Sequence, residues 1–202
     1  METNAMQSLS KFRTPASNKS LGIEIECLVL SDWHYDNSGK HHGFFYATTD
    51  GSIMPPWGRK GQEFVSQPLT KDWLKKEISK LNKKVAWEYN ESCGIHIHVS
   101  RKWLSIKKAK ALYMWMCGLE TDDLQLLFGR RGNTYCRYST VQGEASRYAA
   151  INTTNKETIE FRMFASGDVK WAQYCVDMAD YLVRNANHIN VEAARAFHEL
   201  YY

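Results

Sequence analysis

The sequence lacks cysteines at the spacing of metal or redox motifs. Its five cysteines are an odd number and include no Cys-x-x-Cys pair. This argues against a disulfide framework and against a zinc ribbon, and it favours a reducing compartment. We expect most of the cysteines to be small core residues. Cys93, which directly precedes a Gly-Ile-His-Ile-His run, could instead line a site.

Long apolar runs are also missing. No stretch is long enough to span a bilayer, and Met1 to Ser20 lacks the apolar segment of a signal peptide. We therefore expect a cytoplasmic protein without a membrane partner. Neither an internal repeat nor a Pro/Gly/Ser-rich linker divides the chain. Residues 1–20 are interpreted as a flexible lead-in and residues 21–202 as a single domain.

A charge excess large enough to indicate nucleic-acid binding is absent as well. The formal net charge is only +4 over 202 residues. Six lysines lie between Lys71 and Lys84, and we interpret them as the solvated face of an amphipathic helix. Nucleic acid is thus not the expected partner, although a charged macromolecular target stays open.

The apolar pattern predicts an α+β fold. Strands are expected over residues 22–30, 44–48, 62–66, 94–100, 147–153 and 158–164, and helices over residues 71–87, 105–127, 168–188 and 192–202. Residues 32–43 are interpreted as a polar loop and residues 129–143 as a basic one. Because strands and helices do not alternate regularly, we expect a mainly antiparallel sheet with helices on one face. The other face is then open for polar chemistry.

Acidic and histidine residues are present at alternate positions of several predicted strands. Residues i and i+2 of a strand share a face, as in Glu24-Ile-Glu26, His96-Ile-His98 and Glu160-Phe-Arg162. Each pair alone has an ordinary explanation, such as surface carboxylates or an exposed ion pair of little energetic value. On one sheet face they together favour divalent metals that hold phosphates, because such ions need hard oxygen ligands.

Arginines supply the other candidate phosphate ligands. Arg130, Arg131, Arg137 and Arg147 lie around one predicted loop and strand, and guanidinium groups bind phosphate oxygens in a bidentate manner. We interpret Arg130 as a solvated loop residue. For Arg147, which enters a strand, a phosphate or substrate role is favoured.

Four motifs occur in the order found in a known family. They are GIEIE at residues 22–26, TDGSI at 49–53 followed by EFVS at 63–66, CGIHIHVS at 93–100, and EFR at 160–162. This set resembles the amidoligase family, relatives of glutamine synthetase and glutamate–cysteine ligase, from about residue 21 to residue 165. The resemblance implies a single catalytic domain over residues 21–202. It also implies a curved, mainly antiparallel sheet that binds ATP with Mg²⁺, or with Mn²⁺ in its place.

The resemblance also implies roles for individual residues. By motif position, two metal ions would be held by two sets, Glu26, Asp50 and Glu63, and Glu24, His96 and Glu160. His98 would approach the phosphates. Arg162 would stabilise the transferring γ-phosphoryl group as a catalytic residue, with Arg147 beside it and Arg131 or Arg137 as further phosphate ligands.

The implied activity is ATP-dependent ligation of a carboxylate to an amine. The carboxylate would attack the γ-phosphorus to give an acyl phosphate and ADP, and the amine would then displace phosphate to form an amide or isopeptide bond. Such chemistry depends on positioning and charge neutralisation. Two alternatives stay open: a non-catalytic module that binds nucleotide or protein through the sheet, and a phosphotransferase. The substrates could be small molecules, peptides or proteins, and oligomerisation is left open.

Overall fold

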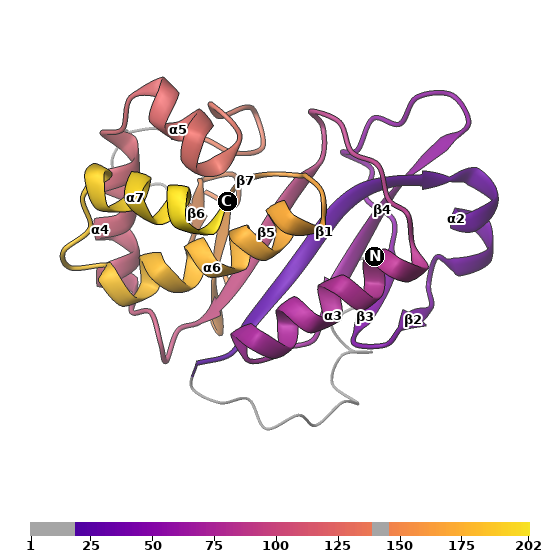
Figure 1. Cartoon of the computed structure of the whole chain (residues 1–202), viewed down its shortest axis with the longest axis horizontal. Coiled ribbons are helices and arrows are strands. Elements are labelled where there is room, and N and C mark those ends of the chain that lie inside the picture. Colours follow the sequence, from indigo (N-terminus) through magenta and orange to yellow (C-terminus); the bar gives the residue numbers. More distant parts are fainter. Residues whose placement is uncertain (1–18, 139–145) are drawn as a thin grey trace.

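A computed structural model describes residues 19–138 and 146–202 of the chain. Within these residues seven strands form one antiparallel sheet in the order β2-β3-β4-β1-β5-β7-β6 (Figure 1). The strands are β1 (Leu21–Leu30), β2 (His41–His42), β3 (Phe45–Thr48), β4 (Arg59–Ser66), β5 (Gly94–Ser100), β6 (Ile151–Asn152) and β7 (Thr158–Ala165). The predicted antiparallel α+β fold is confirmed.

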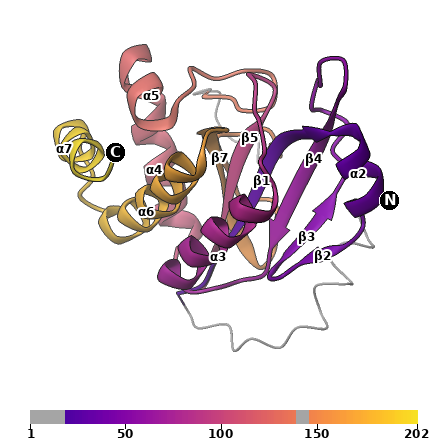
Figure 2. The ribbon, with the colours of Figure 1, turned by 45° about the vertical axis from the view of Figure 1, so that its right-hand side comes forward.

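Six helices accompany the sheet in the described part of the chain. They are α2 (Ser31–Asn37), α3 (Lys71–Lys84), α4 (Ile106–Cys117), α5 (Thr121–Phe128), α6 (Val169–Asn185) and α7 (Val191–Tyr201). Helices α3 and α6 contact each other, and both contact the central strand β1 (Figure 2). Among residues 19–138 and 146–202, no helix has the length and apolar character needed to cross a membrane.

The core lies between the sheet and helices α3 and α6. In β5, Ile95, Ile97 and Val99 are fully buried in this core, as their alternation with the histidines predicts. The α3 lysines also contribute at the helix interface. Lys71 Nζ lies 3.1 Å from Asp180 Oδ2, and Lys75 pairs with Asp177. Part of the predicted solvated lysine face therefore holds α3 against α6.

Three predicted elements differ from the structure. The helix expected over residues 105–127 is two helices, because α4 ends at the C-cap Gly118, a residue type that weakens helices, and the backbone is extended at Glu120. The strand expected over 147–153 is limited to Ile151–Asn152. The polar loop expected over 32–43 contains helix α2, whose Trp33 packs edge-on against the buried Phe64.

Two further expectations concern the chain ends and the cysteines. The predicted lead-in over residues 1–20 lies almost entirely outside the described residues. All five cysteines are free, and four of them are buried. Cys93 packs with Leu28 and Ile53, so its side chain belongs to the core.

Candidate functional site

Strand register assembles the polar face of the sheet. Residues that stand opposite each other on neighbouring strands share a face, as do Glu24 and His96, Glu26 and Glu63, and His98 and Glu160. Their strands are the four adjacent strands β4, β1, β5 and β7. The sheet therefore brings together six charged or titratable side chains that are up to 136 positions apart in the sequence, from Glu24 to Glu160.

The first group of candidate metal ligands is Glu24, His98 and Glu160. One ligand atom from each lies within 4.8 Å of the others. His98 Nε2 is 2.9 Å from Glu24 Oε1. The family resemblance implied His96 as the imidazole ligand here. His96 Nδ1 is also 3.0 Å from Glu24 Oε2, so both imidazoles lie beside these carboxylates.

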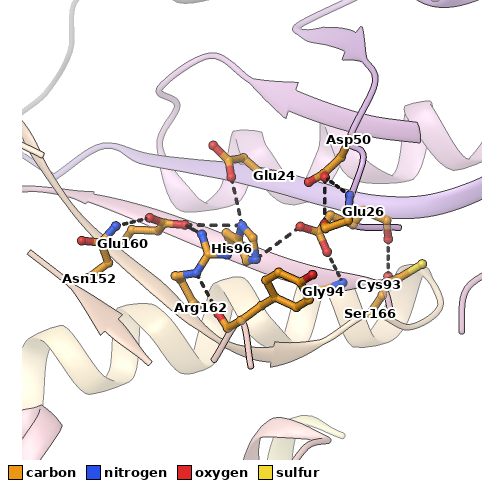
Figure 3. A network of polar contacts seen from close by, with 12 residues as sticks. Glu24, Glu26, Asp50, Cys93, Gly94, His96, Asn152, Glu160, Arg162 and Ser166 are labelled. Carbon is orange, nitrogen blue, oxygen red and sulfur yellow. Dashed lines mark hydrogen bonds and ion pairs between the residues drawn. The ribbon is translucent and has the colours of Figure 1, made fainter. Parts of the chain in front are cut away.

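His96 lies between the two halves of the site. Its Nδ1 is 3.0 Å from Glu24 Oε2 and 3.4 Å from Glu160 Oε1, and its Nε2 is 3.5 Å from Glu26 Oε1 (Figure 3). The side chain is almost fully buried. A β-bulge between β5 and β7 falls at this position, and bulges re-aim side chains next to functional sites. The imidazole thus links both carboxylate groups.

The second group is Glu26, Asp50 and Glu63, the set that the resemblance implied. Their ligand atoms again lie within 4.8 Å of one another. Asp50 reaches the sheet from the loop between β3 and β4, where its Oδ1 accepts hydrogen bonds of 2.7 Å from both the backbone N–H and the hydroxyl of Ser52. This turn fixes the carboxylate beside the strands.

Burial and mutual repulsion shift the ionisation of these carboxyl groups. Burial raises the pKa of Glu63 well above its ordinary value, and the charges of Glu24 and Asp50 raise it further. Burial also raises the pKa of Glu26, in spite of the nearby His96. Clustered carboxylates of this kind are stabilised by a cation. The carboxylate oxygens of both groups suit Mg²⁺ or Mn²⁺.

Glu24 and His98 shift each other's pKa, that of Glu24 downward and that of His98 upward. Burial alone would raise the pKa of Glu24, but the charge of His98 and the hydrogen bonds of both histidines hold it well below its usual range. Burial would lower the pKa of His98, but Glu24 outweighs this and raises it to about 9. The carboxylate of Glu24 thus favours the protonated form of His98.

Arg162 and Asn152 complete the Glu160 end of the site. Arg162 Nη1 pairs with Glu160 Oε1, and the amide of Asn152 donates to Glu160 Oε2 at 2.8 Å (Figure 3). Asn152 stands opposite Glu160 in the β6–β7 pair. Sequence reasoning missed Asn152, although its position one strand away from Glu160 could have indicated it once the hairpin was recognised.

Arg130 is the second functional candidate that sequence reasoning missed. Its interpretation as a solvated loop residue is wrong, because it is half-buried and its Nη2 donates to the Cys93 carbonyl at 2.7 Å. Its charge also lowers the pKa of Glu26, which places the guanidinium near the second group. The surrounding loop has no periodic pattern from which this position could be predicted.

The remaining candidate arginines are exposed and contact other residues. Arg131 Nη2 is 3.6 Å from Asp122 Oδ1, and both side chains are largely exposed. Arg137 and Arg147 hold their guanidinium groups over the ring of Tyr148, at 5.9 Å and 5.1 Å from its centroid. Within the described part of the chain, contacts place Arg162 and Arg130 beside the carboxylate groups, and the phosphate roles implied for Arg131, Arg137 and Arg147 stay predictions.

Gly94 provides space at the centre of the site. Its N–H donates to Glu26 Oε2 at 2.6 Å. A Cβ at this position would lie 3.0 Å from Arg130 Nη2, 3.2 Å from Glu26 Oε2 and 3.3 Å from His96 Nε2. The missing side chain thus leaves room for three charged or titratable groups to converge.

We expect Gly94→Ala to weaken Mg²⁺ binding by about 10- to 100-fold, the range for changes that misplace metal ligands. Gly51→Ala is the matched control, since Gly51 lies in the Asp50 loop and a Cβ there would meet nothing within 4 Å. Calorimetric titration of both variants with MgCl₂ measures the effect. Equal affinities for the two variants would contradict the assigned role of Gly94.

Comparisons with family models, with curated proteins and with solved structures returned no match to this chain.

Proposed function

We propose that the chain is an ATP-dependent carboxylate–amine ligase of the amidoligase type, with a sheet related to that of glutamine synthetase and glutamate–cysteine ligase. The observation that carries this proposal is the pair of carboxylate groups, Glu24/His98/Glu160 and Glu26/Asp50/Glu63, on one face of the sheet. Two neighbouring divalent ions are a recurring arrangement for binding and transferring phosphoryl groups. The family motifs support the same interpretation.

The two groups would hold Mg²⁺ or Mn²⁺, which supplies charge neutralisation to bound phosphates. His96 would orient the carboxylates of both groups through its two ring nitrogens. Arg162 would contact the γ-phosphoryl group, since its guanidinium is already fixed by Glu160 and by the Tyr135 carbonyl. Arg130, which is fixed by the Cys93 carbonyl, would contact a second anionic group, either a phosphate or the substrate carboxylate.

The proposed reaction has two steps. A carboxylate oxygen of the substrate bonds to the γ-phosphorus of ATP while the bond to the β,γ-bridging oxygen breaks, which yields an acyl phosphate and ADP. The amine nitrogen then bonds to the acyl carbon, inorganic phosphate leaves, and the amine loses a proton. Arginines and fixed dipoles stabilise the charge that develops in both steps.

Calorimetric titration of Mg-ATP and of a non-hydrolysable analogue tests the site. We expect magnesium-dependent binding to the wild-type protein and its loss in the Glu24→Ala/His96→Ala variant. Exposed Glu91 offers a matched control in Glu91→Ala, which should bind like the wild type. No binding to the wild type would overturn the ligase proposal and favour a module that binds another protein through the sheet.

Hydroxylamine separates the ligase from a phosphotransferase that uses the same site. An acyl phosphate reacts with hydroxylamine to give a hydroxamate, whereas a phosphorylated guanidino group does not. We expect hydroxamate formation when carboxylates are screened with Mg-ATP and hydroxylamine. Nucleotide binding without ADP release for any carboxylate would instead support a non-catalytic nucleotide-binding module.

A further inference from the structure

Two chain segments form a small addition to the sheet beside β6. Residues 134–138 and 146–150 run side by side, with the Arg137 N–H donating to the Tyr148 carbonyl at 2.8 Å and the Ala150 N–H donating to the Arg137 carbonyl at 3.0 Å. The Ala150 carbonyl in turn accepts from the Arg162 N–H at 2.8 Å on β7. Backbone pairing therefore fixes these segments at the β6 edge of the polar face.

Four side chains of these segments make a cluster of aromatic rings and guanidinium groups. The rings of Tyr135 and Tyr148 have centroids 5.9 Å apart at an interplanar angle of 71°. The guanidinium carbons of Arg147 and Arg137 lie 5.1 Å and 5.9 Å from the Tyr148 centroid. Tyr135 is 40% exposed, and both arginines are exposed. We refer to Tyr135, Arg137, Arg147 and Tyr148 as the edge cluster.

The edge cluster is continuous with the carboxylate groups. The Tyr135 carbonyl accepts a hydrogen bond of 3.3 Å from Arg162 Nε, while Nη1 of the same guanidinium pairs with Glu160. One arginine side chain thus joins the cluster to the Glu24/His98/Glu160 group. A ligand whose anionic part lies at the carboxylate groups would have its next part within reach of the cluster.

We propose that the edge cluster binds the base of the nucleotide, a role that rests on the proposed function. Aromatic rings and guanidinium planes both offer flat faces on which a base stacks, and such stacking is tolerant of the identity of the base. The triphosphate lies at the carboxylate groups and the base lies on Tyr135 and Arg147. The two arginines act through their planar faces in this arrangement, in contrast to a role as point charges for phosphate.

Comparison of two ligands that differ in the base tests this assignment. Mg-ATP and Mg-tripolyphosphate are titrated calorimetrically into the wild type and into Tyr135→Leu, Tyr135→Phe and Arg147→Lys. We expect Tyr135→Leu to lower the affinity for Mg-ATP about tenfold and to leave that for Mg-tripolyphosphate unchanged, as loss of one stacking partner predicts. Tyr135→Phe, which keeps the ring, is expected to bind both ligands like the wild type.

Arg147→Lys distinguishes stacking from charge. Lysine keeps the positive charge but lacks the planar face. We therefore expect Arg147→Lys to lower the affinity for Mg-ATP and to leave the affinity for Mg-tripolyphosphate unchanged. The proposal that the cluster binds the base would be overturned if Tyr135→Leu lost the same affinity for both ligands, or if its affinity for Mg-ATP were unchanged. Wild-type protein that binds Mg-tripolyphosphate as tightly as Mg-ATP would also overturn it, while the phosphate site remained. Wild-type protein that binds neither ligand would overturn the proposed function as well.

Discussion

Glu63→Gln is expected to abolish Mg²⁺ binding at the second group and at the same time to stabilise the metal-free protein. Loss of a direct ligand should lower the Mg²⁺ affinity by at least ~100-fold, which is the upper end of the loss found when residues around metal ligands are changed. The stabilisation follows because burial, together with the charges of Glu24 and Asp50, makes the ionised Glu63 carboxyl unfavourable. A neutral amide of similar size removes that cost. The effects on binding and on stability thus have opposite signs.

Thermal unfolding with and without MgCl₂ measures both effects in one experiment. For a chain of this size, each kcal/mol gained raises the Tm by about 2–4 °C. The Tm of the wild type should rise when Mg²⁺ is added, because the ion binds the folded state. Glu63→Gln should have a higher Tm than the wild type without Mg²⁺ and a smaller rise when Mg²⁺ is added. Glu91→Gln, at an exposed position, controls for the loss of a negative charge. A lower Tm for metal-free Glu63→Gln would show that the carboxylate is part of a favourable ion-pair network.

The same groups predict a pH dependence of metal binding. Because the pKa of Glu63 is raised in the fold, its contribution to stability is present below its ordinary pKa of 4.5 and is lost as pH rises through the raised value. Metal binding needs the ionised carboxyl, so Mg²⁺ affinity should rise with pH over that interval and binding should release protons. Titrations in buffers of different ionisation enthalpy count these protons. Glu63→Gln should release fewer protons than the wild type.

The polar face was predictable from the sequence because strand periodicity is a local property. The i, i+2 pairs Glu24/Glu26 and His96/His98 fix which side chains share a face, and the alternation of Ile95, Ile97 and Val99 fixes which face of β5 packs on the hydrophobic core. The sequence led us to expect an open polar face, whereas Glu26, His96 and Glu160 on that face are buried. The identity of neighbouring strands depends on long-range pairing, so the contact of Glu26 with Glu63 came only from the family motifs. Both His96 and His98 lie about 3 Å from Glu24, at 3.0 Å and 2.9 Å, and such side-chain distances are encoded by no sequence pattern.

The arginines were the least predictable part of the site. Arg130 and Arg131 are adjacent in one loop, yet Arg130 donates to Cys93 while Arg131 faces Asp122 on the surface. Irregular loops have no period from which side-chain direction follows, and their paths are set by contacts with distant segments. The bulge opposite His96 was equally unpredictable, because β7 has one extra residue there and no glycine marks the position.

Arg162→Ala is expected to remove tight binding of a transition-state analogue, Mg-ADP with aluminium fluoride. Arginines that stabilise a transferring phosphoryl group contribute about 10³- to 10⁵-fold to such reactions. We therefore expect a loss of about 10³-fold for the analogue and a smaller loss for Mg-ADP, which lacks the group that Arg162 would contact. Isothermal titration with both ligands measures the difference, and it requires no knowledge of the carboxylate substrate.

A purely structural role of the Arg162–Glu160 pair makes a different prediction. Removal of one partner leaves Glu160 as a buried carboxylate with Asn152 as its hydrogen-bond donor, and breaking a buried pair destabilises a fold. Arg162→Met combined with Glu160→Gln removes both charges and should recover most of the lost Tm. Glu160→Gln alone is the reference for binding, because Glu160 is also a proposed metal ligand. If Arg162 only stabilises the sheet, the double variant binds the analogue as tightly as Glu160→Gln does. If Arg162 contacts the phosphoryl group, stability returns while the double variant binds the analogue more weakly than Glu160→Gln.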